Sequence, residues 1–333
     1  MTNRSAVLHA VHDLRVEERP MPTASPGQVV VRIDAVGICG SDVHYYEHGR
    51  IGPYEVVSPM IVGHESAGVI TEVGEGVDPS RIGQLVALEP GVPDGTCEQC
   101  RAGRYNLCPN VIFFATPPVD GSMTQFVAFD ASFAHVAPAN LTAEQAAMAE
   151  PVAVGVWANR RGQVAPGDRV LVTGAGPVGN FAAQVARAFG ASSVTISDLN
   201  PFRLDAARAL GLDARTPDEV DGDFDVAIEC TGVAAVALAS LKSLAPAGRL
   251  VLVGMGADLV QIDVPFLQGR ELTITGIFRY ANSYPLALDL IGSGKVDVSS
   301  VITHRFGLDE ATAAMTLAAD NPASLKAVVN PQV

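Results

Sequence analysis

The chain is poor in charged residues, in positive charge and in long apolar runs. Only 17% of its 333 residues are charged, below the usual quarter, so much of the chain must be buried. The net charge of −14 argues against nucleic acid and anionic membrane surfaces as partners. No apolar signal segment follows the N-terminus, and the longest uncharged run, between Arg169 and Arg187, is interrupted by glycines and a proline and falls short of a membrane span. We therefore expect a soluble, cytoplasmic protein.

Cysteine is also scarce, and its placement is informative. The chain has five cysteines, an odd number, and three of them cluster at Cys97, Cys100 and Cys108. In a cytosolic chain of this size, clustering favours metal binding over disulfides. Cys230 follows a predicted core strand and is interpreted as a packing residue.

The length predicts two domains, because 333 residues exceed what one hydrophobic core usually serves. The first third is rich in β-formers and closely punctuated by glycine and proline, which indicates a small, irregular β-barrel-like domain. Its clearest predicted strands are residues 29–33, 67–73 and 85–88.

After Glu150 the chain alternates short apolar strands with amphipathic helices, which predicts a parallel sheet covered on both faces. The last stretch reads as two helices and a terminal strand that return to complete the first domain. The predicted elements of this part are strands at 169–173, 194–198, 224–229, 249–253 and 326–329, and helices at about 178–189, 201–210, 285–292 and 308–319.

A glycine-rich loop lies between the first of these strands and its helix. In the run Gly174-Ala175-Gly176-Pro177-Val178-Gly179, Gly174 would allow the tight turn and Gly176 the close approach of a pyrophosphate. Gly179 would allow close packing of helix on sheet, and the helix N-terminus would supply N–H donors to the phosphates. The pattern alone is weak evidence, but its strand–loop–helix context predicts a dinucleotide site.

Asp198 ends the next strand, at the position where a carboxylate binds the adenine-ribose hydroxyls. Its charge would repel the additional phosphate of NADP, which favours NAD. Arg203 is the counter-argument, since an arginine could bind that phosphate, although it could equally be a solvated helix residue.

Four residues outside this loop could hold a catalytic metal: Cys39, His64, Glu65 and Glu150. A thiolate, an imidazole and a carboxylate make a tetrahedral zinc site with one open position. Taken singly, Cys39 could be a small buried hydrophobe and His64 a hydrogen-bonded core histidine. Glu65, however, lies in the largely apolar run 60–73, where an acid requires a cation.

A second cluster contains Asp94, Cys97, Cys100 and Cys108. Two residues separate each of the first three and seven separate the last pair, which is spacing typical of a structural zinc site. Asp94 could supply a carboxylate oxygen as fourth ligand; the alternative is a weakened or empty site.

Together these segments resemble the zinc-dependent medium-chain dehydrogenases, and specifically the sorbitol (polyol) dehydrogenases. The likeness runs over essentially the whole chain, and the segments that carry it are residues 37–45 (Gly-Ile-Cys-Gly-Ser-Asp-Val-His-Tyr), 48–52, 63–65, 103–109, 115–118, 150–151 and 276–280. The departure is Asp94, where most relatives with this lobe carry a cysteine.

The resemblance implies an α/β fold in which a GroES-like catalytic domain, residues 1–152 and 281–333 with a structural-zinc lobe at about 91–110, flanks a Rossmann NAD-binding domain, residues 153–280. It also implies roles for individual residues. Cys39, His64 and Glu65 look like catalytic zinc ligands, with Glu150 a fourth ligand or a partner of zinc-bound water. Ser41 resembles the hydroxyl that takes the substrate proton, and His44 the relay that passes it toward solvent. The implied substrate contacts are Tyr45, Glu150, Arg279 and Tyr280, and the implied NAD contacts beyond the loop glycines are Val178, Asp198, Arg203, Val253, Gly254, Met255, Ile277, Phe278 and Arg279.

The expected activity is transfer of a hydride from a polyol or secondary alcohol, of the sorbitol, xylitol or galactitol type, to NAD. The expected cofactors are NAD and Zn²⁺, and the expected assembly is a homodimer or homotetramer. Three alternatives remain: a zinc dehydrogenase of threonine, butanediol or a sugar acid; a non-catalytic NAD-binding protein; and a zinc-free quinone reductase. The sequence does not fix the preferred polyol or the physiological direction.

Overall fold

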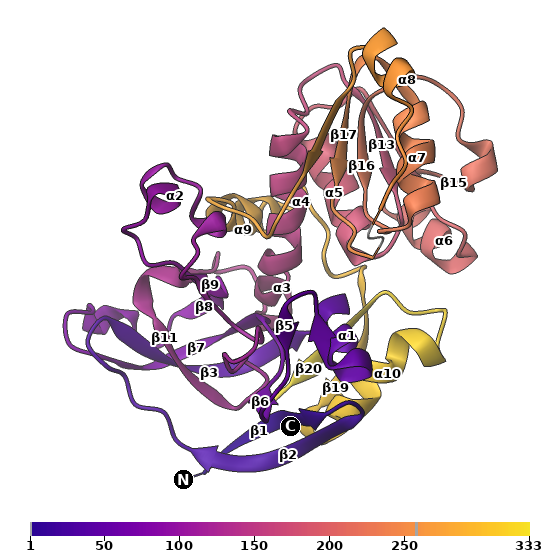
Figure 1. The fold of residues 1–333 in the computed structure, drawn as a ribbon. Helices are drawn as coiled ribbons and strands as arrows, with labels where there is room; N and C mark the ends of the chain where they lie inside the picture. Colours follow the sequence, from indigo (N-terminus) through magenta and orange to yellow (C-terminus); the bar gives the residue numbers. More distant parts are fainter. Residues whose placement is uncertain (1, 257–258) are drawn as a thin grey trace. The chain divides into compact units, whose positions relative to one another are not determined.

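The computed structural model describes residues 2–256 and 259–333 (Figure 1). Met1, part of the predicted first domain, lies outside the described residues. The chain divides into two compact units, Met1–Glu150 with Ile302–Val333, and Pro151–Val301.

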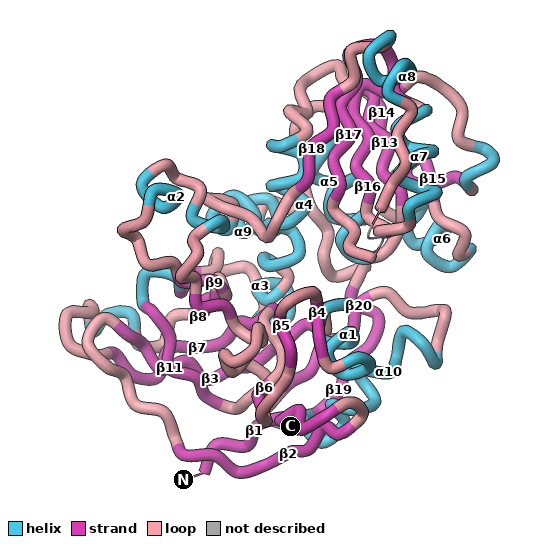
Figure 2. The backbone as a smooth tube through the Cα atoms, viewed as in Figure 1, coloured by secondary structure: helices cyan, strands magenta, loops and turns pink. Residues whose placement is uncertain are grey.

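The first unit is dominated by strands, as predicted (Figure 2). A seven-stranded sheet runs in the order β12-β8-β7-β3-β20-β19, with β11 also paired to β3, and a three-stranded sheet has the order β2-β1-β6. The strands of these sheets are β1 (Thr2–Ala10), β2 (Asp13–Pro20), β3 (Gln28–Gly37), β6 (Met60–Ile61), β7 (Glu65–Val73), β8 (Leu85–Leu88), β11 (Phe126–Asp130), β12 (Ala134–Val136), β19 (Ile302–Gly307) and β20 (Lys326–Asn330).

Short strand pairs and helices complete this unit. They are β4 (Arg50–Ile51) with β5 (Tyr54–Glu55), β9 (Gly91–Val92) with β10 (Ile112–Phe113), and the helices α1 (Gly40–His48), α2 (Glu98–Arg101), α3 (Ala143–Ala147) and α10 (Ala311–Asp320). Helix α10 begins three residues later than predicted, because Leu308–Glu310 forms a 3-10 turn in front of it.

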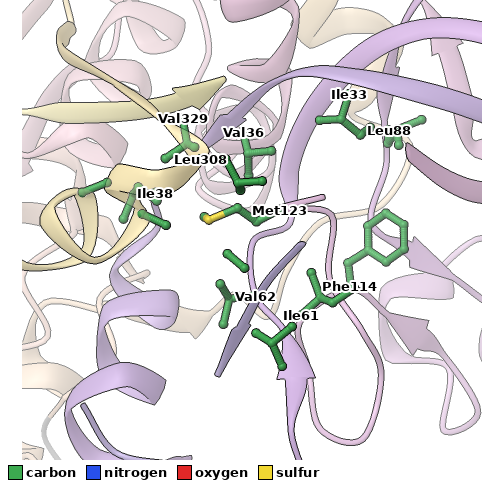
Figure 3. Close-up of a cluster of buried hydrophobic side chains, with 14 of the residues drawn as sticks. Ile33, Val36, Ile38, Ile61, Val62, Leu88, Phe114, Met123, Leu308 and Val329 are labelled. Atoms are coloured by element: carbon green, nitrogen blue, oxygen red, sulfur yellow. The ribbon is translucent and has the colours of Figure 1, made fainter. Parts of the chain in front are cut away.

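The core of the first unit is mainly aliphatic, with a few aromatic rings, and draws on both ends of the chain (Figure 3). Val36 of β3, Met123 and Val329 of β20 are fully buried or nearly so. Each such side chain contributes about 1.5–3 kcal/mol by leaving water. β20 pairs antiparallel with β3, so that Val328 faces Gly37 and Val329 faces Val36. The C-terminal strand therefore completes the sheet and brings Lys326 beside the loop that follows β3.

The second unit is a six-stranded parallel sheet in the order β15-β14-β13-β16-β17-β18. In chain order this is 3-2-1-4-5-6, the arrangement of doubly wound dinucleotide-binding folds, with its switch point between β13 and β16. Its strands are β13 (Arg169–Thr173), β14 (Ser193–Ser197), β15 (Asp213–Arg215), β16 (Phe224–Glu229), β17 (Leu244–Leu252) and β18 (Thr273–Gly276). Its helices are α4 (Ala149–Arg161), which starts in the first unit, α5 (Pro177–Ala188), α6 (Pro201–Ala209), α7 (Ala234–Lys242), α8 (Val264–Gly269) and α9 (Tyr284–Gly292).

Residues 281–301, assigned from the sequence to the GroES-like domain, pack with the second unit. The Gln184 side chain of α5 donates to the carbonyl of Asp297 (3.2 Å) and accepts from its N–H (2.7 Å). Arg160 of α4 donates to the carbonyl of Asn282 at 2.7 Å. These hydrogen bonds connect the segment around α9 to α4 and α5. No local sequence pattern predicts them, because they join residues far apart in the sequence.

None of the helices in the described parts of the chain combines the length and apolarity that a bilayer span requires.

Candidate functional site

Strand pairing brings three of the predicted metal ligands together. Cys39 is the N-cap of α1, directly after β3, and His64 and Glu65 stand where β7 begins. Gly37 of β3 faces Glu65 of β7 in the register. One ligand atom each of Cys39, His64 and Glu65 lies within 4.8 Å of the others.

Gly37 makes this approach possible. A Cβ at position 37 would stand 2.1 Å from Glu65 Oε2, so any side chain there would displace the carboxylate. The site therefore requires glycine at position 37 because of the space that Glu65 occupies, and not because of a left-handed backbone conformation.

Asp42 organises the same site and was not singled out by sequence reasoning. Its buried carboxylate accepts from the N–H groups of Cys39 (3.0 Å) and Gly63 (3.1 Å). It also lies 3.4 Å from His64 Nδ1, which leaves Nε2 as the ring nitrogen available to a metal. The sequence offered one sign of this role: Asp42 lies three residues after Cys39, in the first turn of the helix that Cys39 caps.

Lys326 is the second residue that sequence reasoning missed. Its Nζ donates to Glu65 Oε1 at 2.6 Å and to the carbonyl of Ile38 at 2.8 Å, and lies 2.5 Å from Glu65 Oε2. Both side chains are almost fully buried. The local sign was a lysine at the start of the largely apolar strand β20.

Charge determines the protonation states in this site. Burial alone would lower the pKa of His64, but Asp42 and then Cys39 raise it well above its ordinary value. Burial would likewise lower the pKa of Lys326, but Glu65 and Cys39 raise it. Because the pKa of His64 is raised, a metal ion that binds its ring must displace a proton.

The donor set fits zinc: one thiolate, one imidazole and one carboxylate, clustered and largely buried. Glu150, in the first turn of α4, is 5% exposed. The charge of Glu150 helps to raise the pKa of Lys326, so Glu150 lies near that lysine. Among the described residues, however, Glu150 is not part of the group in which the ligand atoms of Cys39, His64 and Glu65 lie within 4.8 Å of one another. Its role as fourth ligand stays a prediction.

Helix α1 carries three more predicted site residues. Ser41, His44 and Tyr45 are spaced i, i+3 and i+4, so they share one helix face. Ser41 is half-buried, Tyr45 is buried and His44 is exposed, with its ring 4.5 Å from that of His48.

The second predicted metal group is also assembled. One ligand atom each of Asp94, Cys97, Cys100 and Cys108 lies within 4.8 Å of the others. Asp94 Oδ1 accepts from the N–H groups of Thr96 (2.8 Å) and Cys97 (2.9 Å), and Oδ2 from the side chain of Asn110 (2.7 Å). The Cys97 N–H and Asn110 hold the pKa of Asp94 well below its usual range, so a carboxylate faces the three sulfurs.

The glycine loop in the second unit has the predicted form. Gly174 has φ +93°, and Gly176 is the N-cap of α5, where an added Cβ would meet only open space. A Cβ at Gly179 would stand 1.8 Å from the carbonyl oxygen of Gly174, so only glycine allows α5 this close to the loop. Val178 lies in the first turn of that helix.

Asp198 follows β14 and accepts from the N–H of Ala175 at 2.7 Å and of Asn200 at 2.8 Å. Arg203 Nη1 lies 3.7 Å from Asp198 Oδ2. The predicted ribose-binding carboxylate thus also fixes the glycine loop, and the arginine lies beside it.

The remaining predicted cofactor and substrate residues of this unit follow β17 and β18, at the same carboxyl edge of the sheet. They are Val253, Gly254, Met255, Ile277, Phe278, Arg279 and Tyr280. Arg279 has φ +53°, uncommon for a residue with a side chain, and its guanidinium stands 4.7 Å from the Phe278 ring centre. Tyr280 is 3% exposed and its ring centre lies 5.7 Å from that of Tyr284.

Comparisons with known proteins match both units. The family model of the alcohol dehydrogenase GroES-like domain matches residues 25–139, and that of the zinc-binding dehydrogenases matches residues 177–293. The sorbitol dehydrogenase of Mus musculus is 42% identical, covering 95% of this chain and 92% of its own. That of Bacillus subtilis (strain 168) is 41% identical, covering 94% and 92%. The solved structure of an alcohol dehydrogenase from Escherichia coli CFT073 complexed with NADH has a TM-score of 0.92 and 28% identity over 99% of both chains. The predicted fold class, a GroES-like domain with a Rossmann domain, is confirmed.

Proposed function

The chain belongs to the zinc-binding dehydrogenases, in the branch of the sorbitol dehydrogenases, and from this premise we propose that it transfers a hydride from a polyol or secondary alcohol to NAD. The product is the ketose or ketone. The observation that carries the proposal is the buried group of Cys39, His64 and Glu65, which offers zinc three ligands of three kinds. NAD and zinc are the cofactors of the enzyme.

Zinc bound by these three residues, with Glu150 as fourth ligand or as partner of a water, would supply the Lewis acidity that lowers the pKa of the substrate hydroxyl. Ser41 accepts the hydroxyl proton and His44 passes it to solvent. The exposure of His44 and the shared face of Ser41 and His44 on α1 support this relay.

The other hydroxyls of a polyol need hydrogen-bond partners. Tyr45, Glu150, Arg279 and Tyr280, the substrate contacts that the family resemblance implies, offer donors and acceptors of the required kinds. A site built to bind hydroxyls discriminates strongly against analogues that lack them.

The pyrophosphate of NAD binds at Gly174, Gly176, Val178 and Gly179, where the N-terminus of α5 presents its N–H groups. Asp198 binds the adenine-ribose hydroxyls and disfavours NADP, and Arg203 adjoins it. Val253–Met255 and Ile277–Arg279 complete the NAD contacts at the ends of β17 and β18.

A second zinc is held by Cys97, Cys100, Cys108 and Asp94. The assembled group and the ionised state of Asp94 support it. Following the two compact units, we assign residues 1–150 and 302–333 to the catalytic domain and 151–301 to NAD binding. We further propose a cytoplasmic protein that forms, as the family resemblance implies, a homodimer or homotetramer.

A substrate panel tests the proposal and its main alternative, a zinc dehydrogenase of another substrate. Sorbitol, xylitol, galactitol, threonine and butanediol are assayed with NAD and NADP. We expect the highest kcat/KM with a polyol and NAD. A clear preference for threonine or butanediol would mean that the proposed substrate class is wrong. Absence of turnover with every substrate would favour a non-catalytic NAD-binding protein. Activity that survives chelation would revive the zinc-free quinone reductase.

A further inference from the structure

Glu229 is a buried carboxylate that the proposed function does not use. It is the last residue of β16, at the switch point of the parallel sheet, and is 1% exposed. Ligands of such sheets bind outside the carboxyl ends of the strands at this point. Its position therefore joins it to the NAD site rather than to the core alone.

The carboxylate holds the turn that follows its own strand. Oε1 accepts from the N–H of Thr231 at 2.6 Å and from the Thr231 hydroxyl, and both oxygens lie 3.1 Å from the N–H of Gly232. Over the described chain, no lysine, arginine or histidine forms an ion pair with it. Its charge is thus stabilised by donors of the turn, and such bonds are stronger than those between neutral groups.

The turn Thr231–Gly232 packs against the loop after β17 through direct backbone contacts. A Cβ at Gly254 would stand 2.0 Å from the Gly232 nitrogen, and a Cβ at Gly232, where φ is +71°, would stand 2.5 Å from the Met255 carbonyl oxygen. The N–H groups of Val253 and Gly254 donate to the carbonyl of Glu229, at 2.8 and 2.9 Å. A shift of the turn must therefore move Val253–Met255.

The same turn touches the pyrophosphate loop on its other side. The N–H of Cys230 donates to the carbonyl of Thr173 at 2.9 Å, and a Cβ at Gly174 would stand 2.9 Å from Thr231 Cγ2. Thr231 thus lies between the two loops proposed to contact NAD.

We propose that Glu229 and Thr231 are positioning residues for NAD: the carboxylate clamps the Thr231–Gly232 turn, and the turn sets the spacing between the loop at Gly174 and the loop at Val253–Met255. The inference rests on the proposed NAD contacts of these loops. Glu229 and Thr231 act through the loop backbones and take no part in the hydride transfer.

The test compares Thr231→Val, which removes the hydroxyl, with Thr231→Ser, which keeps it, and with Glu229→Gln. The matched control is Thr216→Val, because Thr216 caps the 3-10 turn Pro217–Glu219 of the same unit, where Glu219 accepts from its N–H at 2.8 Å. NADH affinity is measured by fluorescence titration of the zinc-loaded enzyme, beside KM for NAD, KM for the polyol and the unfolding midpoint.

We expect Thr231→Val and Glu229→Gln to weaken NADH binding about tenfold, as loss of a hydrogen bond to a charged group does. KM for NAD rises in parallel, KM for the polyol does not, and Thr231→Ser and Thr216→Val bind NADH as the wild type does. If Thr231→Val binds NADH normally, or if Thr231→Ser fails to restore binding, the clamp does not position the cofactor. If Glu229→Gln does not fold, the comparison of Thr231→Val with Thr231→Ser is sufficient to test the proposal. Failure of the wild type to bind NADH would instead overturn the proposed NAD site itself.

Discussion

Single side chains in the metal centre show what sequence reasoning reached and what it missed. Cys39, His64 and Glu65 were predicted because metal-binding side chains in apolar or glycine-rich segments are visible locally. Asp42 and Lys326 were not, because their roles arise from burial and from a pairing between chain positions far apart. Lys326 meets Glu65 only after β20 has paired with β3, and no local pattern encodes that contact.

Lys326 offers the sharpest test at this scale. In the metal-free protein, Lys326→Met leaves Glu65 buried without its cation, which should cost about 3–5 kcal/mol of unfolding free energy. Zinc should restore more stability to this variant than to the wild type, because the cation that shares Glu65 with the metal is gone. Denaturant unfolding with and without zinc measures both effects, with the exposed Lys295→Met as control. Equal stability of the two metal-free variants would show that the pair is dispensable.

Arg279 tests the proposed contact with the substrate. Arg279→Ala should raise KM for polyols strongly, by about tenfold or more, because a charged donor to the hydroxyls is lost. KM for a simple secondary alcohol should change little. Steady-state kinetics with both substrates separates the two roles, since equal increases would point to a plain structural residue.

Secondary-structure elements were the easiest features to predict. β13, α5 and β14 were predicted almost to the residue, because short apolar runs, a glycine turn and Pro177 at the helix start mark them locally. β17 begins five residues earlier than the predicted 249, at Leu244, since its first part, Leu244-Ala245-Pro246-Ala247-Gly248, contains the proline and glycine that usually interrupt strands.

Two glycines of the nucleotide loop should fail for different reasons. Gly179→Ala puts a Cβ against the Gly174 carbonyl, so it should lower both stability, by about 1–3 kcal/mol, and NADH affinity. Gly176→Ala meets open space in the chain alone, so it should leave stability nearly unchanged yet weaken NADH binding, because the methyl group stands where the pyrophosphate approaches. Thermal unfolding and NADH titration of the two variants, run side by side, check this split. A Gly176→Ala enzyme with normal NADH affinity would contradict the loop's assignment.

At the scale of the whole molecule, two zinc ions per chain are expected, one in each assembled ligand group. Cys100→Ser should reduce the content to about one zinc per chain and lower the stability of the lobe while the remaining zinc supports turnover. Metal analysis of the purified protein and of the variant measures this. One zinc per wild-type chain, lost on mutation of Cys39, would mean that Asp94 does not replace the missing cysteine.

The two-unit organisation was foreseen from the change in strand and helix pattern after Glu150. The packing of residues 281–301 with the second unit was not predicted. It depends on hydrogen bonds such as those between Gln184 and Asp297, which join positions far apart in the sequence.

The most direct measurement is polyol oxidation and NADH binding in Cys39→Ser beside the wild type. The account predicts that the variant loses turnover by orders of magnitude and loses zinc from the centre, yet binds NADH with nearly unchanged affinity, because the cofactor loops belong to the other unit. Turnover at the wild-type rate in a Cys39→Ser protein free of that zinc would contradict the account at its centre.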